Sequence, residues 1–227
     1  MRIGVVDDDE ATIAFITQVL GNSGYGCVPF RRSSDVIPAL RSDTFDLLIL
    51  DWNMPELDGL DILKWARGNI AACPPVIMLT SHSDKEDIAA ALNAGADDFI
   101  VKPESALVIG ARVDAVLRRT RAQPSIERYG QFGGYCFDRQ DEQVSFYGEA
   151  VLLTAKEFAL AHLFFCNLHK PLSRPYIMEK VWKSVADVST RTLDMHVSRI
   201  RSKLRLCADN GYRLETVFGF GYRLEPC

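Results

Sequence analysis

A carboxylate at position 51 ends one of several apolar runs in the first half of the chain. Leu48-Ile49-Leu50 leads into Asp51, and a turn-forming Pro-x-x-Asp-Gly follows. This pattern predicts a buried strand that delivers the Asp51 carboxylate to its carboxyl end, where open α/β sheets collect their chemistry. Because Asp is common after strands, this motif alone is weak evidence for a functional site and needs support from other residues.

Polar side chains end three further apolar runs at similar spacing. The apolar run over residues 3–6 leads into Asp7 and Asp8, the run over residues 76–79 leads into Thr80, and the run over residues 99–101 leads into Lys102. Helical patterns separate the runs, and such β–α alternation predicts a parallel sheet with right-handed crossovers. We therefore expect all of these polar side chains to meet at one edge of one sheet.

The predicted edge could hold a divalent metal ion and a phosphoryl group. The repulsion between Asp7, Asp8 and Asp51 is relieved by a hard cation, and oxygen ligands suit Mg²⁺. The backbone carbonyl of Asn53 could add a ligand from the turn. Asp51 could then attack a phosphoryl donor and form an acyl phosphate, a known type of carboxylate chemistry.

Lys102 and Thr80 would complete this site. Lys102 would neutralise phosphoryl oxygens, because phosphoryl transfer depends mostly on positioning and electrostatics, and Thr80 could donate its hydroxyl to the new phosphate. Each residue also has an ordinary interpretation. Lys102 could be a surface residue at a strand end, and Thr80 could cap a helix that starts near Asp84.

The second half of the chain predicts strands, three helices and a final hairpin. Residues 143–153 read as two strands around a Gly-containing turn, and Thr154-x-x-Glu157 is a capping box that opens an apolar helix to residue 167. A shorter helix is predicted over residues 175–182. Residues 212–217 and 221–224 then form two strands around Phe218-Gly219-Phe220, directly after a third helix.

This third helix, predicted over residues 189–206, has one apolar and one basic face. Its apolar residues recur at spacings of four, three and four: Leu193, Val197, Ile200 and Leu204. The opposite face gathers Arg191, Met195, Ser198, Arg199 and Ser202. Arg and small polar residues suit the DNA major groove, although an ordinary amphipathic helix with a solvated basic face has the same pattern.

Taken in order, the residues of the first half resemble the receiver domain of two-component response regulators. The resemblance covers residues 1–121 and implies a flavodoxin-like α/β fold, a doubly wound sheet of five parallel strands. It assigns the roles of phosphoacceptor (Asp51), metal-binding acids (Asp7 and Asp8), phosphate-sensing hydroxyl (Thr80) and phosphate-contacting Lys (Lys102). Phe99 falls where the family places its switch aromatic, three residues before the Lys.

The second half resembles the winged-helix effector domain of the OmpR/PhoB subfamily. The resemblance rests on Leu153-Thr154-x-x-Glu157-Phe158, on residues 191–201 and on Gly219-Phe220-Gly221-Tyr222-Arg223. It implies an α+β winged helix-turn-helix domain over residues 129–227, joined to the receiver by a linker over 122–128. The third helix would lie in the major groove of double-stranded DNA, and the wing near the minor groove.

The expected DNA-binding residues divide by the part of the duplex that they would contact. Base edges are expected for Arg191, Met195, Ser198 and Arg199, phosphates for Arg201 and Lys203, and His196, Thr216 and Phe218 complete the set. Some family members carry Arg at the wing position of Phe218, where it could enter the minor groove. An aromatic ring can only pack or stack there, so this departure puts wing readout in question.

The resemblance also implies a sensor histidine kinase, a homodimer on tandem half-sites and, as a further candidate partner, RNA polymerase. The family dimerises through its fourth helix, fifth strand and fifth helix, and Asp97, Asp98 and Arg112 fit the charge pairs of that face. Residues 88–92 are apolar where basic partners are expected. Dimerisation could therefore be more hydrophobic, weaker or less dependent on phosphorylation.

Composition supports two domains in a cytoplasmic protein. Residues 1–121 carry 12 Lys/Arg and 18 Asp/Glu, a net charge of −6, and residues 122–227 carry 14 and 12, a net charge of +2. The acidic half fits a cation site, and the basic half is a weak indication of nucleic acid. Scattered cysteines, no signal-peptide pattern and no apolar run of membrane-spanning length predict a cytoplasmic protein with no membrane partner.

Two alternatives remain open beside a phosphorylation-controlled regulator, whose only catalysis would be transfer to and hydrolysis from its own Asp51. One keeps the DNA-binding fold without control by phosphorylation. The other is an enzyme, a phosphohydrolase of the haloacid-dehalogenase type, in which Asp7 would be the nucleophile. Multiple turnover of a small phosphate ester, abolished by Asp7→Asn, would identify that enzyme. It gives the Asp51 motif and the second half of the chain no role.

Overall fold

The chain folds into two compact units, Met1–Ala122 and Gln123–Cys227, in a computed structural model that describes residues 1–81, 85–120, 128–182 and 190–227. The predicted linker over 122–128 lies outside the described residues except for Arg128. Among the described residues, no helix has the length and apolar character needed to cross a membrane.

The first unit is built on five parallel strands. They are β1 (Arg2–Val6), β2 (Gly26–Phe30), β3 (Leu47–Asp51), β4 (Val76–Thr80) and β5 (Asp98–Val101). Their order in the sheet is β2-β1-β3-β4-β5, and every neighbouring pair is parallel. This confirms the predicted doubly wound, flavodoxin-like sheet.

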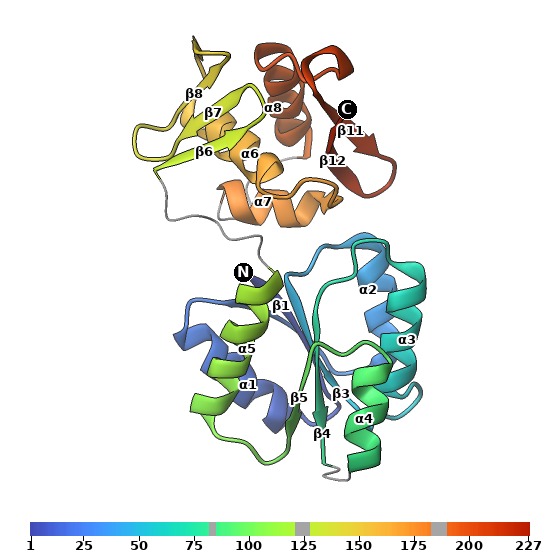
Figure 1. Cartoon of the computed structure of the whole chain (residues 1–227). Coiled ribbons are helices and arrows are strands. Elements are labelled where there is room, and N and C mark those ends of the chain that lie inside the picture. The colour runs from blue at the N-terminus through green and yellow to red at the C-terminus, as the bar shows by residue number, and fades with distance from the viewer. Residues whose placement is uncertain (82–84, 121–127, 183–189) are drawn as a thin grey trace. The chain divides into compact units, whose positions relative to one another are not determined.

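Helices cover both faces of this sheet. They are α1 (Glu10–Asn22), α2 (Val36–Ser42), which follows the short turn η1 (Ser33–Asp35), α3 (Gly59–Asn69), α4 (Lys85–Asn93) and α5 (Ala106–Thr120). Figure 1 shows α1 and α5 on one face and α2, α3 and α4 on the other. Each strand therefore needs apolar side chains on both sides.

The central strand β3 meets this requirement with consecutive apolar residues. Leu47 and Ile49 belong to the core under α1 and α5, whereas Leu48 and Leu50 belong to the core under α2 and α3. Near-continuous apolar runs of this kind mark parallel strands that are buried on both faces. Burial of each such side chain stabilises the fold by about 1.5–3 kcal/mol, which holds the end of β3 firmly in place.

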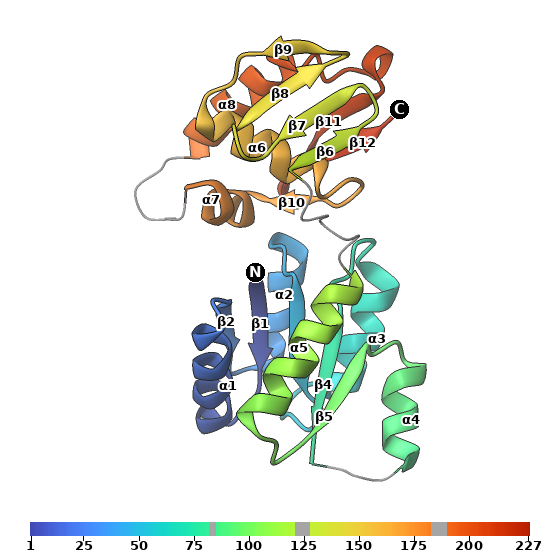
Figure 2. The same cartoon turned by 60° about the vertical axis from the view of Figure 1, so that its left-hand side comes forward.

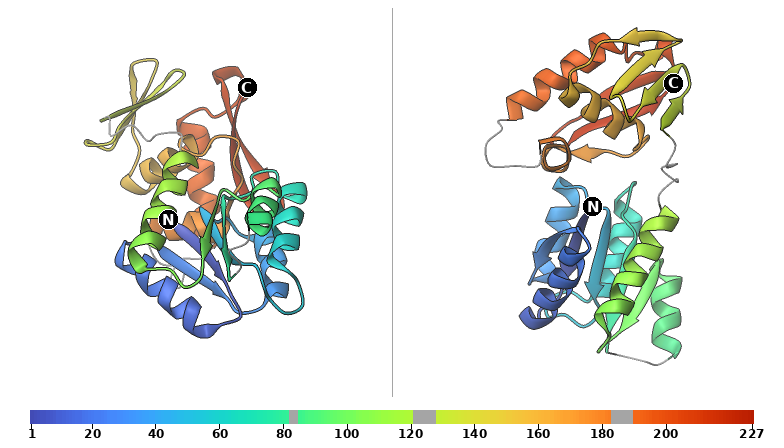
Figure 3. Two further views of the ribbon diagram at one scale, coloured as in Figure 1. Left: turned by 60° about the horizontal axis from the view of Figure 1, so that its bottom comes forward. Right: turned by 90° about the vertical axis from the view of Figure 1, so that its left-hand side faces the viewer.

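The described residues of the second unit form two antiparallel sheets, three α-helices and one short 3-10 helix. Its strands are β6 (Tyr129–Phe132), β7 (Tyr135–Asp138), β8 (Gln143–Phe146), β9 (Glu149–Val151), β10 (Leu172–Ser173), β11 (Tyr212–Val217) and β12 (Gly221–Pro226). Its helices are α6 (Ala155–Phe165), α7 (Arg174–Trp182), α8 (Thr190–Lys203) and the short η2 (Ala208–Asn210). Figure 2 shows the β6–β9 sheet next to α6, and Figure 3 shows the β11–β12 hairpin beside α8 from two directions.

The predicted features of the third helix are confirmed in α8. Leu193, Val197 and Ile200 are completely buried in the core of the second unit, with α6, α7 and both sheets around them. The hydroxyl of Tyr135 donates a hydrogen bond of 2.6 Å to the carbonyl of Leu204 just beyond the helix. This anchored stripe leaves the opposite face of α8 to solvent. The Thr154–Glu157 capping box is also present at the start of α6.

Candidate functional site

Strand register brings two acidic residues together at the carboxyl edge of the parallel sheet. Val6 is paired with Leu50, so the residues that follow, Asp7 and Asp51, end adjacent strands. Both side chains are buried, at 0 % and 4 % exposure, whereas Asp8 is exposed. One carboxylate oxygen from each of the three residues lies within 4.8 Å of the other two. The structure thus forms the predicted acidic cluster.

Lys102 reaches this cluster from the end of β5. Its Nζ atom lies 2.6 Å from Oδ2 of Asp7 and 2.6 Å from Oδ1 of Asp51, so one ammonium group bridges both buried carboxylates. The amide of Lys102 donates to the carbonyl of Thr80, 2.7 Å away, which places the buried Thr80 at the same edge. The four polar strand ends therefore lie together.

Electrostatics at this edge favours additional positive charge. The pKa of Asp51 is raised to about 6, mainly by burial and to a smaller extent by the charges of Asp7 and Asp8, against the lowering effect of the Lys102 ammonium. Burial acts to lower the pKa of Lys102, but its hydrogen bonds to Asp51 and Asp7 outweigh burial and raise it. Mg²⁺ prefers oxygen ligands, and a divalent cation relieves the repulsion between crowded carboxylates. Asp7, Asp8 and Asp51 therefore fit such an ion.

The loop after β3 is tied closely to Asp51. Asp58 caps α3 by accepting a hydrogen bond of 2.8 Å from the amide of Leu60, and the amide of Gly59 donates to the carbonyl of Trp52. A Cβ atom at Gly59 would lie 2.0 Å from the carbonyl oxygen of Asp51. Glycine is therefore required where the Pro-x-x-Asp-Gly turn packs against the strand end.

Ser33 also holds this loop, a role that the sequence did not indicate. Its Oγ atom donates a hydrogen bond of 2.7 Å to the carbonyl of Pro55 and accepts one of 3.1 Å from the amide of Leu57. The Ser33 side chain is buried, and it follows β2 rather than β3. It thereby fixes the turn that contains Asn53.

Residues expected at the switch and the dimer face take part in contacts within the first unit. Phe99 is half-buried against the core under α2 and α3, with the guanidinium of Arg112 5.8 Å from its ring centroid. Arg112 also pairs with Asp98 at 2.9 Å. Asp97 accepts hydrogen bonds from Arg67 and from the amide of Val76, both 2.7 Å long.

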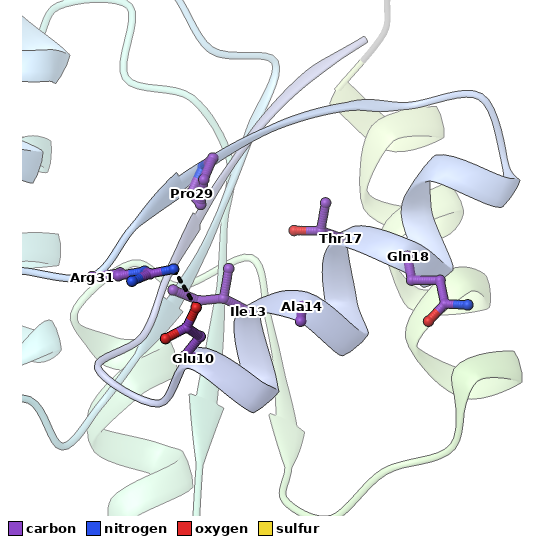
Figure 4. A pocket seen from close by; sticks show the side chains of 7 residues that line it. All are labelled: Glu10, Ile13, Ala14, Thr17, Gln18, Pro29 and Arg31. Atoms are coloured by element: carbon purple, nitrogen blue, oxygen red, sulfur yellow. Dashed lines mark hydrogen bonds and ion pairs between the residues drawn. The ribbon is translucent and has the colours of Figure 1, made fainter.

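A shallow hollow between α1 and β2 does not include the acidic cluster (Figure 4). It contains the ion pair between Glu10 and Arg31, whose charged atoms lie 2.5 Å apart. The other lining residues are Ile13, Ala14, Thr17, Gln18 and Pro29. None of the three clustered carboxylates lines it, so we regard the sheet edge as the chemical site of this unit.

The second candidate site is the solvent face of α8. The side chains at its centre are exposed and include two cations: Arg191, Met195, Ser198, Arg199 and Ser202. Within the part of the chain that the structure describes, neither Arg191 nor Arg199 has an ion pair with an acidic residue. Both guanidinium groups are therefore available to an external anion.

The other predicted DNA-binding residues of α8 have partners inside the second unit. Lys203 lies 2.7 Å from the buried carboxylate of Glu157, and Arg201 donates to the carbonyl of Leu214 and to the hydroxyl of Thr216. His196 contacts the carbonyl of Thr192 at 2.8 Å and packs edge-on against Trp182. Burial raises the pKa of Glu157, but hydrogen bonds from Lys203 and the amide of Thr154 lower it more.

One polar cluster was not anticipated from the sequence. The hydroxyl of Tyr222 donates to Asp194 at 2.5 Å, and Arg174 donates to the same Asp194 oxygen at 3.0 Å. Burial, and the hydrogen bond to Asp194, raise the pKa of Tyr222 to about 12. These contacts join α7, α8 and β12, so the hairpin is attached to the exposed helix by side chains.

Two protein-family models match the chain, one in each of its two compact units. Residues 3–114 match the response regulator receiver domain, and residues 148–224 match the C-terminal domain of transcriptional regulatory proteins. The acidic cluster lies in the first match, and α8 with the β11–β12 hairpin lies in the second.

Relatives match along nearly the whole chain. The DNA-binding response regulator MtrA of Mycolicibacterium smegmatis is 32 % identical over 99 % of this chain and 97 % of its own length. The regulatory protein VanRc of Enterococcus gallinarum is 31 % identical over 99 % and 98 %. Among solved structures, the receiver domain of the Francisella response regulator 1452 is 28 % identical, covers 52 % of this chain and 98 % of its own, and has a TM-score of 0.50.

Proposed function

Because this chain belongs to the OmpR/PhoB subfamily of two-component response regulators, which bind DNA, we propose that phosphorylation of Asp51 controls its activity as a transcription regulator. The observation that supports this most directly is the contact of one Lys102 ammonium with the buried Asp7 and Asp51. This contact supports phosphoryl transfer to Asp51, and the phosphohydrolase alternative gives the matched C-terminal domain no role.

In the proposed reaction, a carboxylate oxygen of Asp51 attacks the phosphorus of a donor. The donor is a phosphohistidine of a sensor histidine kinase or a small acyl phosphate. The new O–P bond forms as the bond to the donor atom breaks, and the donor leaves with the electron pair. The ammonium of Lys102, already next to Asp51, is positioned to pair with phosphoryl oxygens that carry the transferred charge. Hydrolysis from Asp51 resets the protein.

Asp7, Asp8, Asp51 and the backbone carbonyl of Asn53 would hold Mg²⁺. When bound, the ion supplies positive charge that offsets the repulsion between carboxylates and phosphoryl oxygens. The chain itself contributes a cluster in which Asp51 and Asp7 are already desolvated, while Asp8 is exposed to solvent. The fixed loop around Asn53 keeps its carbonyl close to the end of β3.

Thr80 and Phe99 would transmit the phosphorylated state. The hydroxyl of Thr80 would donate to the phosphoryl group, and Phe99 would move inward as Thr80 shifts. The contacts of Asp98 with Arg112 next to Phe99 would then rearrange into a dimer face with Asp97. Two effector domains (129–227), each linked through 122–128 to its receiver (1–121), would bind tandem half-sites in the cytoplasm and contact RNA polymerase.

Phosphorylation can be measured directly. Native mass spectrometry of the wild-type chain with Mg²⁺, with and without acetyl phosphate, should show one phosphoryl adduct per chain and a larger dimer fraction. Omission of Mg²⁺ should suppress both. An adduct with an unchanged oligomer would support the phosphorylation-independent regulator instead.

Ser33→Ala should slow phosphorylation by acetyl phosphate several-fold without preventing it. The substitution removes the partly buried hydrogen bonds of the Pro55 carbonyl and the Leu57 amide, each worth about 0.5–1.5 kcal/mol. The loop that carries Asn53 should loosen, and a higher Mg²⁺ concentration should be needed for half-maximal quenching of Trp52 fluorescence. Ser42→Ala, which removes an exposed hydroxyl from α2, is the control. Equal Mg²⁺ dependence in both variants would contradict the positioning role.

A further inference from the structure

The tip of the β11–β12 hairpin presents a fully exposed aromatic ring. Phe218 is fully exposed to solvent, at 100 % relative accessibility. It lies in a tight turn closed by a hydrogen bond of 3.0 Å from the amide of Phe220 to the carbonyl of Val217, with Gly219 at a φ of 70°. The turn is specified by its glycine and hydrogen bond, so it gives no structural reason for a large apolar side chain at the tip.

This tip is held in a fixed position relative to the exposed face of α8. Arg201 of α8 donates to Leu214 and Thr216 of β11 at 2.9 and 3.1 Å, and Asp194 of α8 accepts from Tyr222 of β12. At the base of the turn, Gly221 packs so closely on β10 that a Cβ atom would lie 2.0 Å from the carbonyl oxygen of Leu172. The hairpin that carries Phe218 is therefore attached to α8 through both of its strands and packs closely on β10 at the base of its turn.

The hairpin offers little free positive charge. Residues 212–226 contain two Arg and two Glu, which gives a formal charge of zero. Arg213 pairs with Glu215, and Arg223 pairs with both Glu215 and Glu225. Within the hairpin, then, every cation has an acidic neighbour. An interaction of the tip with an external partner would be dominated by the apolar ring rather than by attraction to phosphates.

We propose that Phe218 is an apolar wedge that enters the minor groove of duplex DNA and recognises how easily the duplex deforms. The inference rests on the proposed docking of α8 in the major groove, because α8 holds the hairpin and so determines which surface the ring meets. Apolar side chains inserted from the minor groove partly unstack a base step and kink the duplex. Pyrimidine–purine steps such as TA and CA deform most easily, so they are the expected targets.

The test compares full-length variants on duplexes enriched from a random-sequence pool by the phosphorylated wild-type chain. Sequencing should show a pyrimidine–purine step at a fixed distance from the bases that α8 selects. Phe218→Ala should lose this step preference and bind the enriched duplex about 5- to 150-fold more weakly, as for other removed base-stacking aromatics. Its dependence of log Kd on log salt should equal that of the wild type, because no charge is removed.

Phe218→Arg should differ from Phe218→Ala in both affinity and salt dependence. It should recover part of the affinity but steepen the salt dependence by about 0.9, the value for one added phosphate contact. Tyr147→Ala removes an exposed aromatic from a different hairpin of the same unit and should match the wild type. Fluorescence of 2-aminopurine at the selected step should rise on binding of wild type and not of Phe218→Ala.

Different failures have different meanings. If the wild type enriches no duplex at all, the proposed DNA docking is wrong. If it enriches a duplex but Phe218→Ala keeps the same step preference and affinity, the wedge is wrong and the docking stands. Weaker binding by Phe218→Ala without a 2-aminopurine signal in the wild type would also overturn insertion.

Discussion

Asp51→Asn should abolish the phosphoryl adduct formed with acetyl phosphate, together with any increase in dimer. An amide lacks the nucleophilic oxygen of a carboxylate. The neighbouring Asp7 follows a different strand and is paired with Lys102, so we do not expect it to replace Asp51 as the phosphoacceptor. Loss should be complete rather than partial, because no other carboxylate occupies the end of β3. Native mass spectrometry of the adduct and the dimer fraction measures both effects in one experiment.

The Asp51→Asn variant should remain folded. Burial raises the pKa of Asp51 above its ordinary value, so ionised Asp51 is less favourable in the folded chain than in the unfolded one at neutral pH. Its neutral replacement should therefore unfold at an equal or higher temperature. Asp9→Asn is a matched control, because Asn also caps helices well and Asp9 caps α1 without a proposed role in transfer. A full adduct on Asp51→Asn would place the phosphoacceptor elsewhere.

The sheet edge could be predicted because four of its proposed functional residues directly follow apolar runs: Asp7, Asp51, Thr80 and Lys102. In parallel strands that position determines the location of a side chain, whatever the helices between the strands do. Strand β2 was not singled out by the same reasoning. Its sequence, Gly-Cys-Val-Pro-Phe, is only half-buried and includes a proline, which is tolerated because β2 is an edge strand.

Contacts between distant residues were beyond the reach of sequence patterns. Ser33 holds a loop 22 residues away through one hydroxyl, and a serine after a strand carries no signal of that role. In α8, helical periodicity identified the buried stripe correctly. It could not reveal that Lys203 lies against Glu157 of α6, because the angular position of a residue on a helix does not specify what the neighbouring element offers.

The second large prediction concerns the cations of α8, which differ in whether they have partners inside the second unit. Arg191 and Arg199 are exposed without an acidic partner in the described chain, whereas Arg201 is attached to the hairpin. The double variant Arg191→Ala/Arg199→Ala should therefore weaken binding to the enriched duplex more than any other pair of charge removals on this face. Each base-edge contact is worth about 1–3 kcal/mol, so the pair should cost roughly 30-fold or more.

Binding isotherms at several salt concentrations separate base recognition from phosphate contact. The double variant should discriminate less between the enriched duplex and one with the selected bases changed. Arg201→Ala should instead weaken binding to all sequences and lower the salt slope by about 1, if its guanidinium contacts a phosphate while it holds the hairpin. Arg128→Ala, an exposed Arg paired with Asp138, is the control. Unchanged discrimination in the double variant would remove α8 from the DNA interface, and an unchanged slope in Arg201→Ala would make that residue purely structural.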